Sequence, residues 1–245
     1  MSRAVFISDL HISSAADPKL DLLKSFLDKC ALYRVNDLFL VGDIFDLWIA
    51  DRAHFTKTYS DVIAKLTHLK TLGITIHYFE GNHDLDLKLY WEEQLGFDVQ
   101  ESAAHYRLGD LEVRVEHGDQ MDPSDRGYLF LRWFLRTGFM RFMGRHLPDG
   151  VVRWIGRRAS HASRDYTTQV KVVSEEQVRA KIHAHARRAY QVKPFDLLVT
   201  GHVHVAEDRV LDGKFRCIGL GTWLKEALVL DVQGANVRLI RVEDF

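Results

Sequence analysis

The chain has 245 residues, of which 47% are hydrophobic and 27% charged, so it has the composition of an ordinary globular protein and can bury a full core. Its only cysteines, Cys30 and Cys217, are too few for a disulfide framework, which favours a reducing cytoplasm. The sequence has no apolar run long enough to span a bilayer and no signal-peptide layout, and this argues against a membrane-spanning or secreted protein.

Strand-like and helix-like segments alternate in the first part of the chain. Short β-rich runs predict buried strands at 3–8, 37–41 and 74–79. Apolar residues at helical spacing predict helices at 18–33, 57–72 and 86–95. This succession predicts an α/β protein built from βαβ units around a largely parallel sheet.

The later part of the chain predicts hairpins on either side of a helical segment. A turn dipeptide separates two alternating runs at three places, namely Gly109-Asp110, Asp212-Gly213 and Gln233-Gly234. Mostly helical sequence occupies 122–190, and the strand-like run 195–200 then resumes the sheet. We therefore expect one domain over residues 1–245, with 122–190 as a helical insert within it.

Five polar fragments follow predicted strands at the point where each strand ends. They are Asp9-x-His11, Gly42-Asp43, Gly81-Asn82-His83-Asp84, His117-Gly118 and Gly201-His202-x-His204. In open α/β sheets ligands bind at the carboxyl ends of strands, so these fragments are expected to meet. One such fragment alone is more often a helix cap or a turn, whereas five in this order indicate a metal site.

The side chains in these fragments form a mixed oxygen and nitrogen ligand set. Such a set suits Mn, Fe, Zn or Co better than calcium, and the lack of thiolates argues against a structural zinc knot. The candidate ligands are Asp9, His11, Asp43, Asn82, His117, His202 and His204. Seven are too many for one ion and fit two ions that share a carboxylate, with one oxygen for each ion, as in enzymes that catalyse in-line displacement at phosphorus.

This ordered set of motifs resembles that of the calcineurin-like metallophosphoesterases, and the resemblance covers nearly the whole chain outside the insert. It implies a sandwich of two β-sheets flanked by helices, with a two-metal site along one edge. His83 would be a catalytic residue near the leaving group, and Asp84 would orient it by hydrogen bonding. By position in the motifs, one ion would be held by Asp9, His11 and His204, the other by Asn82, His117 and His202, and Asp43 would bridge them.

Three further stretches narrow the resemblance: GDIFDLWIAD (42–51), HGDQMDPSDRGY (117–128) and Gly221-Thr222-Trp223. They look like the UDP-2,3-diacylglucosamine pyrophosphohydrolases of bacterial lipid A synthesis. That resemblance implies cleavage of the pyrophosphate of UDP-2,3-diacylglucosamine to UMP and 2,3-diacylglucosamine 1-phosphate, with two divalent ions, for which we expect Mn²⁺. The best-known branch of the family has Arg at the position of His83.

The same resemblance implies a set of substrate contacts. Asp125 is the best-matched of them, because it begins an Asp-x-Gly-Tyr pattern after His117. Asn82, His83 and His202 would also face the substrate. Donors for phosphate or uracil in the insert would be Arg157, Arg158, Ser160 and Arg164.

Residues 126–158 of the insert combine eight Arg with many large apolar residues, and they hold no Lys and a single acid, Asp149. One interpretation is an amphipathic segment at the membrane interface, in which Arg132, Arg136, Arg141 and Arg145 meet anionic lipid phosphates. The residues expected to line a groove for acyl chains are Phe130, Trp133, Phe134, Phe139, Met140, Phe142 and Met143. From composition alone, a lid packed on the core with a solvated basic face is equally compatible. The resemblance favours the lipid interpretation, and with it a cytoplasmic enzyme attached peripherally to the inner face of the membrane.

Two other classes of function are compatible with parts of the sequence. A metallophosphoesterase that acts on another nucleotide pyrophosphate or phosphodiester would keep the metal site, but its lid has little use for so many Phe and Trp. A protein that holds nucleic acid on basic helices would show degraded metal ligands. All the candidate ligands are present here, so no nucleic-acid partner is expected.

Overall fold

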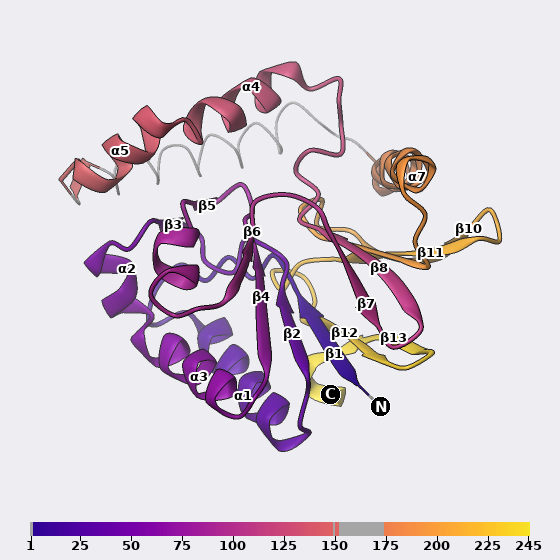
Figure 1. Ribbon diagram of the computed structural model, residues 1–245, viewed down its shortest axis with the longest axis horizontal. Coiled ribbons are helices and arrows are strands. Elements are labelled where there is room, and N and C mark those ends of the chain that lie inside the picture. Colours follow the sequence, from indigo (N-terminus) through magenta and orange to yellow (C-terminus); the bar gives the residue numbers. More distant parts are fainter. Residues whose placement is uncertain (1, 149, 152–173) are drawn as a thin grey trace.

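The computed structural model describes residues 2–148, 150–151 and 174–245. Two β-sheets pack face to face, and helices cover their outer sides (Figure 1). A separate two-stranded sheet pairs β3 (Trp48–Ile49) with β5 (Asp84–Leu85). This architecture is the metallophosphoesterase sandwich that the sequence motifs imply.

The first sheet has the strand order β13-β12-β1-β2-β4-β6. Its strands are β1 (Arg3–Ile7), β2 (Asp37–Leu40), β4 (Thr75–Phe79), β6 (Asp98–Gln100), β12 (Leu228–Gln233) and β13 (Asn236–Arg241). The four strands from the first half of the chain run parallel, and the hairpin β12–β13 is added antiparallel beside β1. The predicted βαβ succession is therefore confirmed.

The second sheet has the order β10-β11-β9-β8-β7. Its strands are β7 (Ala104–Leu108), β8 (Leu111–Glu116), β9 (Leu197–Thr200), β10 (Ala206–Leu211) and β11 (Phe215–Leu220). The three central strands are parallel, and each edge is closed by the outer strand of an antiparallel hairpin. All three predicted hairpins are confirmed, and they are divided between the two sheets.

Alternation along β1 shows how the core is divided. Ala4 and Phe6 pack between the two sheets, while Val5 and Ile7 face the helices on the outer side of the first sheet. Those helices are α1 (Pro18–Leu32) and α3 (Ser60–Thr71), which contribute buried side chains to the same cluster. Because the central strands β1 and β2 have both faces covered, their carboxyl ends are the part left to reach solvent.

Two predicted helices differ from the structure. The helix expected at 57–72 is divided at Tyr59 into α2 (Ala53–Thr58) and α3. The Tyr59 ring is buried against Phe45, and its hydroxyl donates to the Ile12 carbonyl, so tertiary contacts interrupt the helix. The helix expected at 86–95 is only a short π-helical turn, Lys88–Glu92. The structure also contains β3, β5 and β6, which the sequence did not predict.

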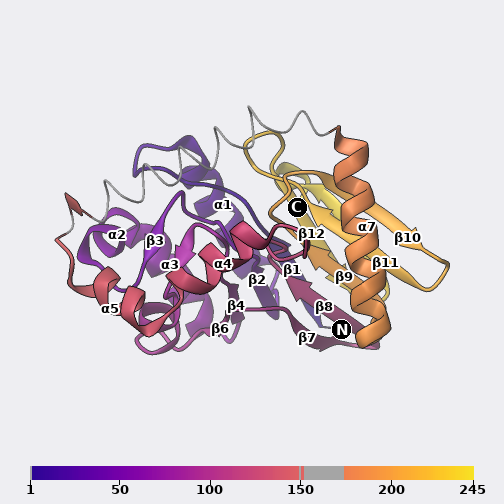
Figure 2. The ribbon, with the colours of Figure 1, turned by 90° about the horizontal axis from the view of Figure 1, so that it is seen from above.

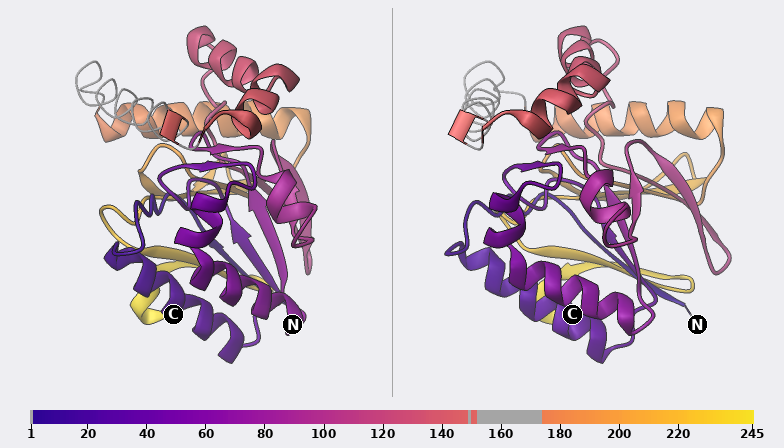
Figure 3. Two further views of the ribbon diagram at one scale, coloured as in Figure 1. Left: turned by 90° about the vertical axis from the view of Figure 1, so that its left-hand side faces the viewer. Right: turned by 60° about the vertical axis from the view of Figure 1, so that its left-hand side comes forward.

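The described part of the predicted insert contains three helices: α4 (Arg126–Leu135), α5 (Gly138–His146) and α7 (Glu175–Val192). Figure 2 shows α4 and α5 lying over the ends of the strands. By contrast, α7 lies along the outer face of the second sheet, where Ile182 and Ala186 pack against Leu198 (Figure 3). Among the described helices, none is long and apolar enough to cross a membrane.

Candidate active site

The structure brings all five polar fragments to one end of the sandwich, where strands of both sheets end. Among the described residues, three groups of side chains have ligand atoms within 4.8 Å of one another, and two of these groups consist entirely of candidate ligands. One group consists of Asp9, His11 and His204, and the other of Asp43, His117 and His202. Since the members of each group come from both sheets, only the packing of the two sheets completes either group.

The first group is arranged around an unpaired oxygen of Asp9. Asp9 Oδ1 lies 3.2 Å from His204 Nε2 and 3.8 Å from His11 Nε2, and these two nitrogens are 3.1 Å apart. Asp9 Oδ2 accepts from the backbone N–H of His202 and from the Ser8 hydroxyl. Asp9 Oδ1 is buried and has no hydrogen-bond partner among the described residues. A buried carboxylate oxygen that faces two ring nitrogens fits a metal ion well.

The second group shows the same convergence of acceptors. His117 Nδ1 donates to the Val41 carbonyl at 2.9 Å, so Nε2 is the ring nitrogen that faces the other side chains of the group. That nitrogen lies 3.2 Å from Asn82 Oδ1 and 3.5 Å from Asp43 Oδ2. His202 Nδ1 lies 2.8 Å from the same Asn82 oxygen. Several lone pairs that point at one another are stabilised by a cation between them, so Asn82 belongs with this group.

Asp43 is a member of the second group that also faces the first group. Its Oδ1 accepts from the backbone N–H of His83 at 2.9 Å. Its Oδ2 lies 4.0 Å from His11 Nε2 and 3.5 Å from His117 Nε2. Oδ1 thus already accepts one backbone hydrogen bond, and the expectation that each oxygen of this carboxylate serves one ion stays a prediction. A single oxygen, Oδ2, faces both groups.

The electrostatics favour a positive charge at this position. Burial raises the pKa values of Asp9 and Asp43, but the neighbouring imidazoles outweigh it and hold both below their ordinary value. Burial lowers the pKa values of His11 and His202 to about 4, so both rings are neutral at pH 7, as metal ligands must be. Burial also lowers the pKa of His117, yet the adjacent Asp43 carboxylate more than offsets this and raises it to about 10.

The backbone around the ligands is unusual. Five of the seven candidate ligands have positive φ angles: Asp9 (54°), His11 (47°), Asp43 (53°), His202 (68°) and His204 (56°). Non-glycine residues rarely adopt this left-handed conformation, which costs on the order of 1–3 kcal/mol each and is concentrated at functional sites. The strand ends therefore hold these side chains in place through strained backbone.

Gly81 is required because the Asp43 side chain lies against it. A Cβ at position 81 would come within 2.0 Å of Asp43 Oδ1. Gly81→Ala is therefore expected to displace the shared carboxylate and to lower kcat by about 10²-fold, the effect of an ångström-scale misplacement. Metal content and turnover of a small phosphodiester would be measured beside Gly138→Ala, where an added Cβ meets nothing within 4 Å. Normal metal content and turnover in Gly81→Ala would contradict this account of the site.

His83 and Asp84 are adjacent in sequence but have different surroundings. The prediction that Asp84 orients His83 by hydrogen bonding is wrong. Asp84 Oδ2 accepts from the backbone N–H groups of Asp43 and Gly81, at 2.9 Å and 3.0 Å, whereas His83 Nδ1 donates to the Asp46 carbonyl at 2.8 Å. The reason is that Asp84 begins β5, so its side chain and that of His83 point to opposite sides. Burial and the charge of Asp43 raise the pKa of Asp84 to about 8.

Two residues of the Gly-Thr-Trp stretch support Asp9 from behind. Thr222 Oγ1 donates to the Asp9 carbonyl at 2.8 Å, and the Trp223 backbone N–H donates to the same oxygen at 3.2 Å. In the sequence, Gly221-Thr222-Trp223 is only a point of resemblance to a known family. The structure gives it a physical role, because the two donors fix the strained backbone of the first ligand.

Four arginines of the segment α4–α5 pair with acids of the body of the protein. Arg132 pairs with Asp119, Arg136 with Glu80, Arg141 with Glu101 and Arg145 with Asp86, at 2.6, 3.2, 2.9 and 2.8 Å. The prediction that these four arginines meet lipid phosphates is therefore wrong. Their partners are distant in sequence, so helical periodicity alone did not reveal them. The acids Asp119, Glu80, Glu101 and Asp86 were not singled out from the sequence at all.

The large apolar side chains of the same helices lie on the exposed side. The exposed fraction is 63% for Phe130, 63% for Trp133, 67% for Phe139 and 57% for Phe142. The segment α4–α5 is thus amphipathic, but its charged face is turned toward the protein and its apolar face toward the surroundings. An exposed apolar patch of this kind is typical of an interaction site.

The remaining predicted substrate contacts have different outcomes. Asp125 Oδ1 accepts from the backbone N–H of Tyr128, so Asp125 is the N-cap of α4, and as a substrate contact it stays a prediction. Arg157, Arg158, Ser160 and Arg164 lie outside the described residues.

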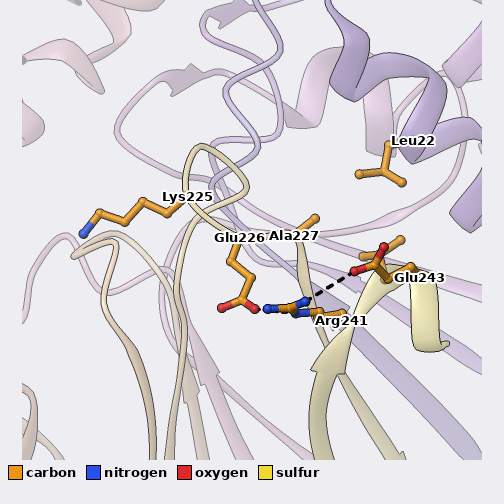
Figure 4. A pocket seen from close by; sticks show the side chains of 7 residues that line it. Leu22, Lys225, Glu226, Ala227, Arg241 and Glu243 are labelled. Carbon is orange, nitrogen blue, oxygen red and sulfur yellow. Dashed lines mark hydrogen bonds and ion pairs between the residues drawn. The ribbon is translucent and has the colours of Figure 1, made fainter.

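A pocket of about 570 Å³ lies elsewhere, between α1 and the C-terminal strands (Figure 4). Arg241 pairs there with Glu226 and Glu243. In the described part of the chain, its lining residues include no member of the two ligand groups. The candidate site is thus defined by the ligand groups and not by this pocket.

Comparison with known proteins agrees with this geometry. The family model described as calcineurin-like phosphoesterase matches residues 2–206. A protein of Pseudomonas entomophila strain L48 named UDP-2,3-diacylglucosamine hydrolase is 30% identical over 241 residues, which cover 94% of this chain and 95% of that protein. A protein of the same name from Pseudomonas putida strain F1 is 29% identical, with the same coverage of 94% and 95%.

Among solved structures, an archaeal phosphodiesterase shares the fold, with a TM-score of 0.52 at 12% sequence identity, covering 98% of this chain and 99% of that one. The match of the family model extends over the strands and loops that carry all seven candidate ligands. The chain therefore belongs to the calcineurin-like phosphoesterase family of metal-dependent hydrolases.

Proposed function

We propose that this protein hydrolyses the pyrophosphate bond of UDP-2,3-diacylglucosamine, giving UMP and 2,3-diacylglucosamine 1-phosphate, as a step of lipid A biosynthesis. The names of the relatives that align over nearly the whole chain support this substrate. The observation that carries the proposal is the position of α4 and α5, whose exposed apolar side chains lie beside the ligand groups. The ring of Tyr128 on α4 lies 6.3 Å from that of His202, while Trp133 on the same helix is 63% exposed.

The seven candidate ligands fit two divalent ions. Asp9, His11 and His204 would hold one ion, Asn82, His117 and His202 would hold the other, and Asp43 would contact both through Oδ2. Two such ions, which we propose to be Mn²⁺, would stabilise charge on the phosphoryl oxygens and lower the pKa of bound water. The chain contributes imidazoles, of which those of His11 and His202 are neutral at pH 7, and buried carboxylates in fixed positions.

We propose that His83 assists the leaving group. Its Nδ1 is held by the Asp46 carbonyl at 2.8 Å, so Nε2 is free to face the substrate. In its protonated form the ring donates a proton to the departing phosphate oxygen. Asp84 acts indirectly, because it accepts from the N–H groups of Asp43 and Gly81 and so holds the two ligand loops together.

The polar part of the substrate would lie between the ligand groups and the segment α4–α5, which we call the lid. We propose that Asn82, His83 and His202 contact the phosphates, together with Asp125. Further contacts to the headgroup are proposed for Arg157, Arg158, Ser160 and Arg164 of the insert. The lipid end would then extend along α4 and α5.

The acyl chains are proposed to lie against the exposed aromatic residues of α4 and α5, which would also contact the membrane surface. We therefore propose that the protein works in the cytoplasm, peripherally attached to the inner face of the membrane. Four arginines do not take part in this contact, because they pair with acids of the protein: Arg132, Arg136, Arg141 and Arg145. Apolar contact of this kind is strengthened by about 0.8 kcal/mol for each buried methylene.

Changing Trp133 and Phe134 together to Ser is expected to raise KM for the lipid substrate at least about tenfold, because the acyl chains lose apolar partners. Hydrolysis of a small chromogenic phosphodiester, which reaches only the metal site, should hardly change. The matched control is Leu32→Ser with Leu72→Ser, which removes apolar side chains that are 73% and 53% exposed, against 63% and 39% for Trp133 and Phe134, and that lie on α1 and after α3. An equal loss of both activities in the Trp133/Phe134 variant would mean that these aromatic residues serve as packing.

The proposed substrate is tested by product analysis. Purified protein, Mn²⁺ and a UDP-diacylglucosamine are incubated, and the products are identified by mass spectrometry. UMP and the lipid 1-phosphate are expected in equal amounts. An enzyme that cleaves soluble nucleotide pyrophosphates or phosphodiesters but leaves the lipid substrate intact would support the alternative instead.

A further inference from the structure

Arg136 connects the lid to the loop that carries Asn82 and His83. It follows α4 directly, at the bend between α4 and α5, and its side chain is only 10% exposed. Arg136 Nε lies 3.2 Å from Glu80 Oε2, and Nη2 donates to the Gly81 carbonyl at 3.1 Å. One guanidinium therefore contacts two consecutive residues that immediately precede Asn82.

Glu80 closes the same loop from inside. Its side chain is fully buried, and its Oε1 accepts from the backbone N–H of Leu87 at 2.9 Å. The carboxylate at the start of the loop 80–87 thus binds the N–H at the end of the loop, while its other oxygen binds Arg136. Asn82 and His83 lie between these two points.

The loop and the lid are electrostatically coupled as a result. Without the guanidinium, a buried carboxylate would be left without a counter-charge, which is costly. Arg145 adds a second link from the lid to the same loop, because it pairs with Asp86 at 2.8 Å. Docking of α4 and α5 on the protein therefore stabilises one conformation of the loop.

We propose that Arg136 is a positioning residue, which holds Asn82 and His83 in their working places by clamping Glu80 and Gly81 from the lid. The inference rests on the roles proposed above for Asn82 and His83, and it does not depend on the identity of the substrate. It gives the lid a second task besides contact with lipid. The conformation of the loop 80–87 then depends on whether α4 packs against the protein.

The test uses the Mn²⁺-loaded full-length protein and a small chromogenic phosphodiester, which is too short to reach the aromatic residues of the lid. Arg136→Met is expected to lower kcat about 10- to 100-fold with KM changed by less than about twofold, because a small displacement of the loop weakens contacts in the transition state more than binding of the substrate. Arg136→Lys restores the charge but not the two-point contact. It is expected to recover most of the Tm and still to lower kcat at least about fivefold.

The matched control is Arg3→Met. Arg3 binds the buried Asp231 through Nε and Nη2, at 2.8 Å and 3.0 Å, at the start of β1, which is the end of the strand opposite to the ligand loops. Loss of that pair should lower Tm and leave kcat unchanged, as expected for a purely structural pair.

The inference is overturned if Arg136→Met, folded by circular dichroism, keeps kcat within about twofold of the parent. Should Arg136→Met fail to fold, Arg136→Lys decides: a kcat equal to that of the parent overturns the inference, and a lowered kcat with near-normal Tm supports it. A parent protein that cleaves the small diester but not the UDP-linked lipid would refute the proposed substrate and leave this inference intact.

Discussion

Asp43→Ala is expected to lower kcat by on the order of 10³-fold or more, because it removes the one oxygen that faces both ligand groups. The backbone N–H of His83 would also lose its acceptor, so the adjacent catalytic residue would be less well held. Metal content by mass spectrometry, turnover of a small phosphodiester and circular dichroism would be measured on the same preparations. We expect fewer than two ions per chain and a retained fold.

The matched control for this variant is Asp231→Asn. Asp231 is as buried as Asp43, at 1% exposed, and it pairs with Arg3 and Arg238 away from the ligand loops. Its loss should affect stability but not metal content. Two ions per chain and near-normal turnover in Asp43→Ala would refute the assignment of Asp43 as the shared ligand.

The second large effect is expected for His83→Ala, which should lower kcat about 10²- to 10⁴-fold, the usual contribution of general acid–base help. Metal content should be unchanged, because His83 belongs to neither of the two groups that we propose as ion sites. His83→Arg keeps a cationic donor at the same position, and we expect it to retain more activity than His83→Ala.

The measurement also discriminates between two roles of this ring. His83 lies near His11 and Asp46, and ligand atoms of these three residues come within 4.8 Å of one another. Loss of an ion in His83→Ala would therefore identify His83 as a ligand and contradict the role of proton donor. A normal ion content with a lowered kcat supports that role.

The orientation of α4 and α5 changes how an amphipathic sequence is interpreted. Arginines four residues apart next to aromatic residues predicted a basic face toward lipid phosphates. In the structure the basic face is neutralised by acids such as Asp119 and Glu80, which follow or precede metal-ligand motifs. The charges thus hold the lid on the protein, and the apolar face is what is left for an outside partner.

Local sequence patterns predicted most of the strands, the three hairpins and the set of candidate ligands, but not the short strands β3, β5 and β6. These features depend on local patterns: alternating apolar runs, turn dipeptides such as Asp212-Gly213, and polar residues directly after strands. Because parallel strands present their carboxyl ends at one edge, residues as distant as Asp9 and His204 were expected to meet. The structure does bring them within 3.2 Å.

The pairing of strands and of side chains from distant parts of the chain could be seen only in the tertiary structure. It placed the hairpin β12–β13 in the first sheet and β10–β11 in the second, assigned Oδ2 of Asp43 to both groups, and gave His83 the Asp46 carbonyl as its partner. It also turned Arg136 toward Glu80, 56 residues earlier in the chain. Local periodicity fixes which side chains share a face, but the partner of that face depends on long-range packing, in which buried charges must find counter-charges.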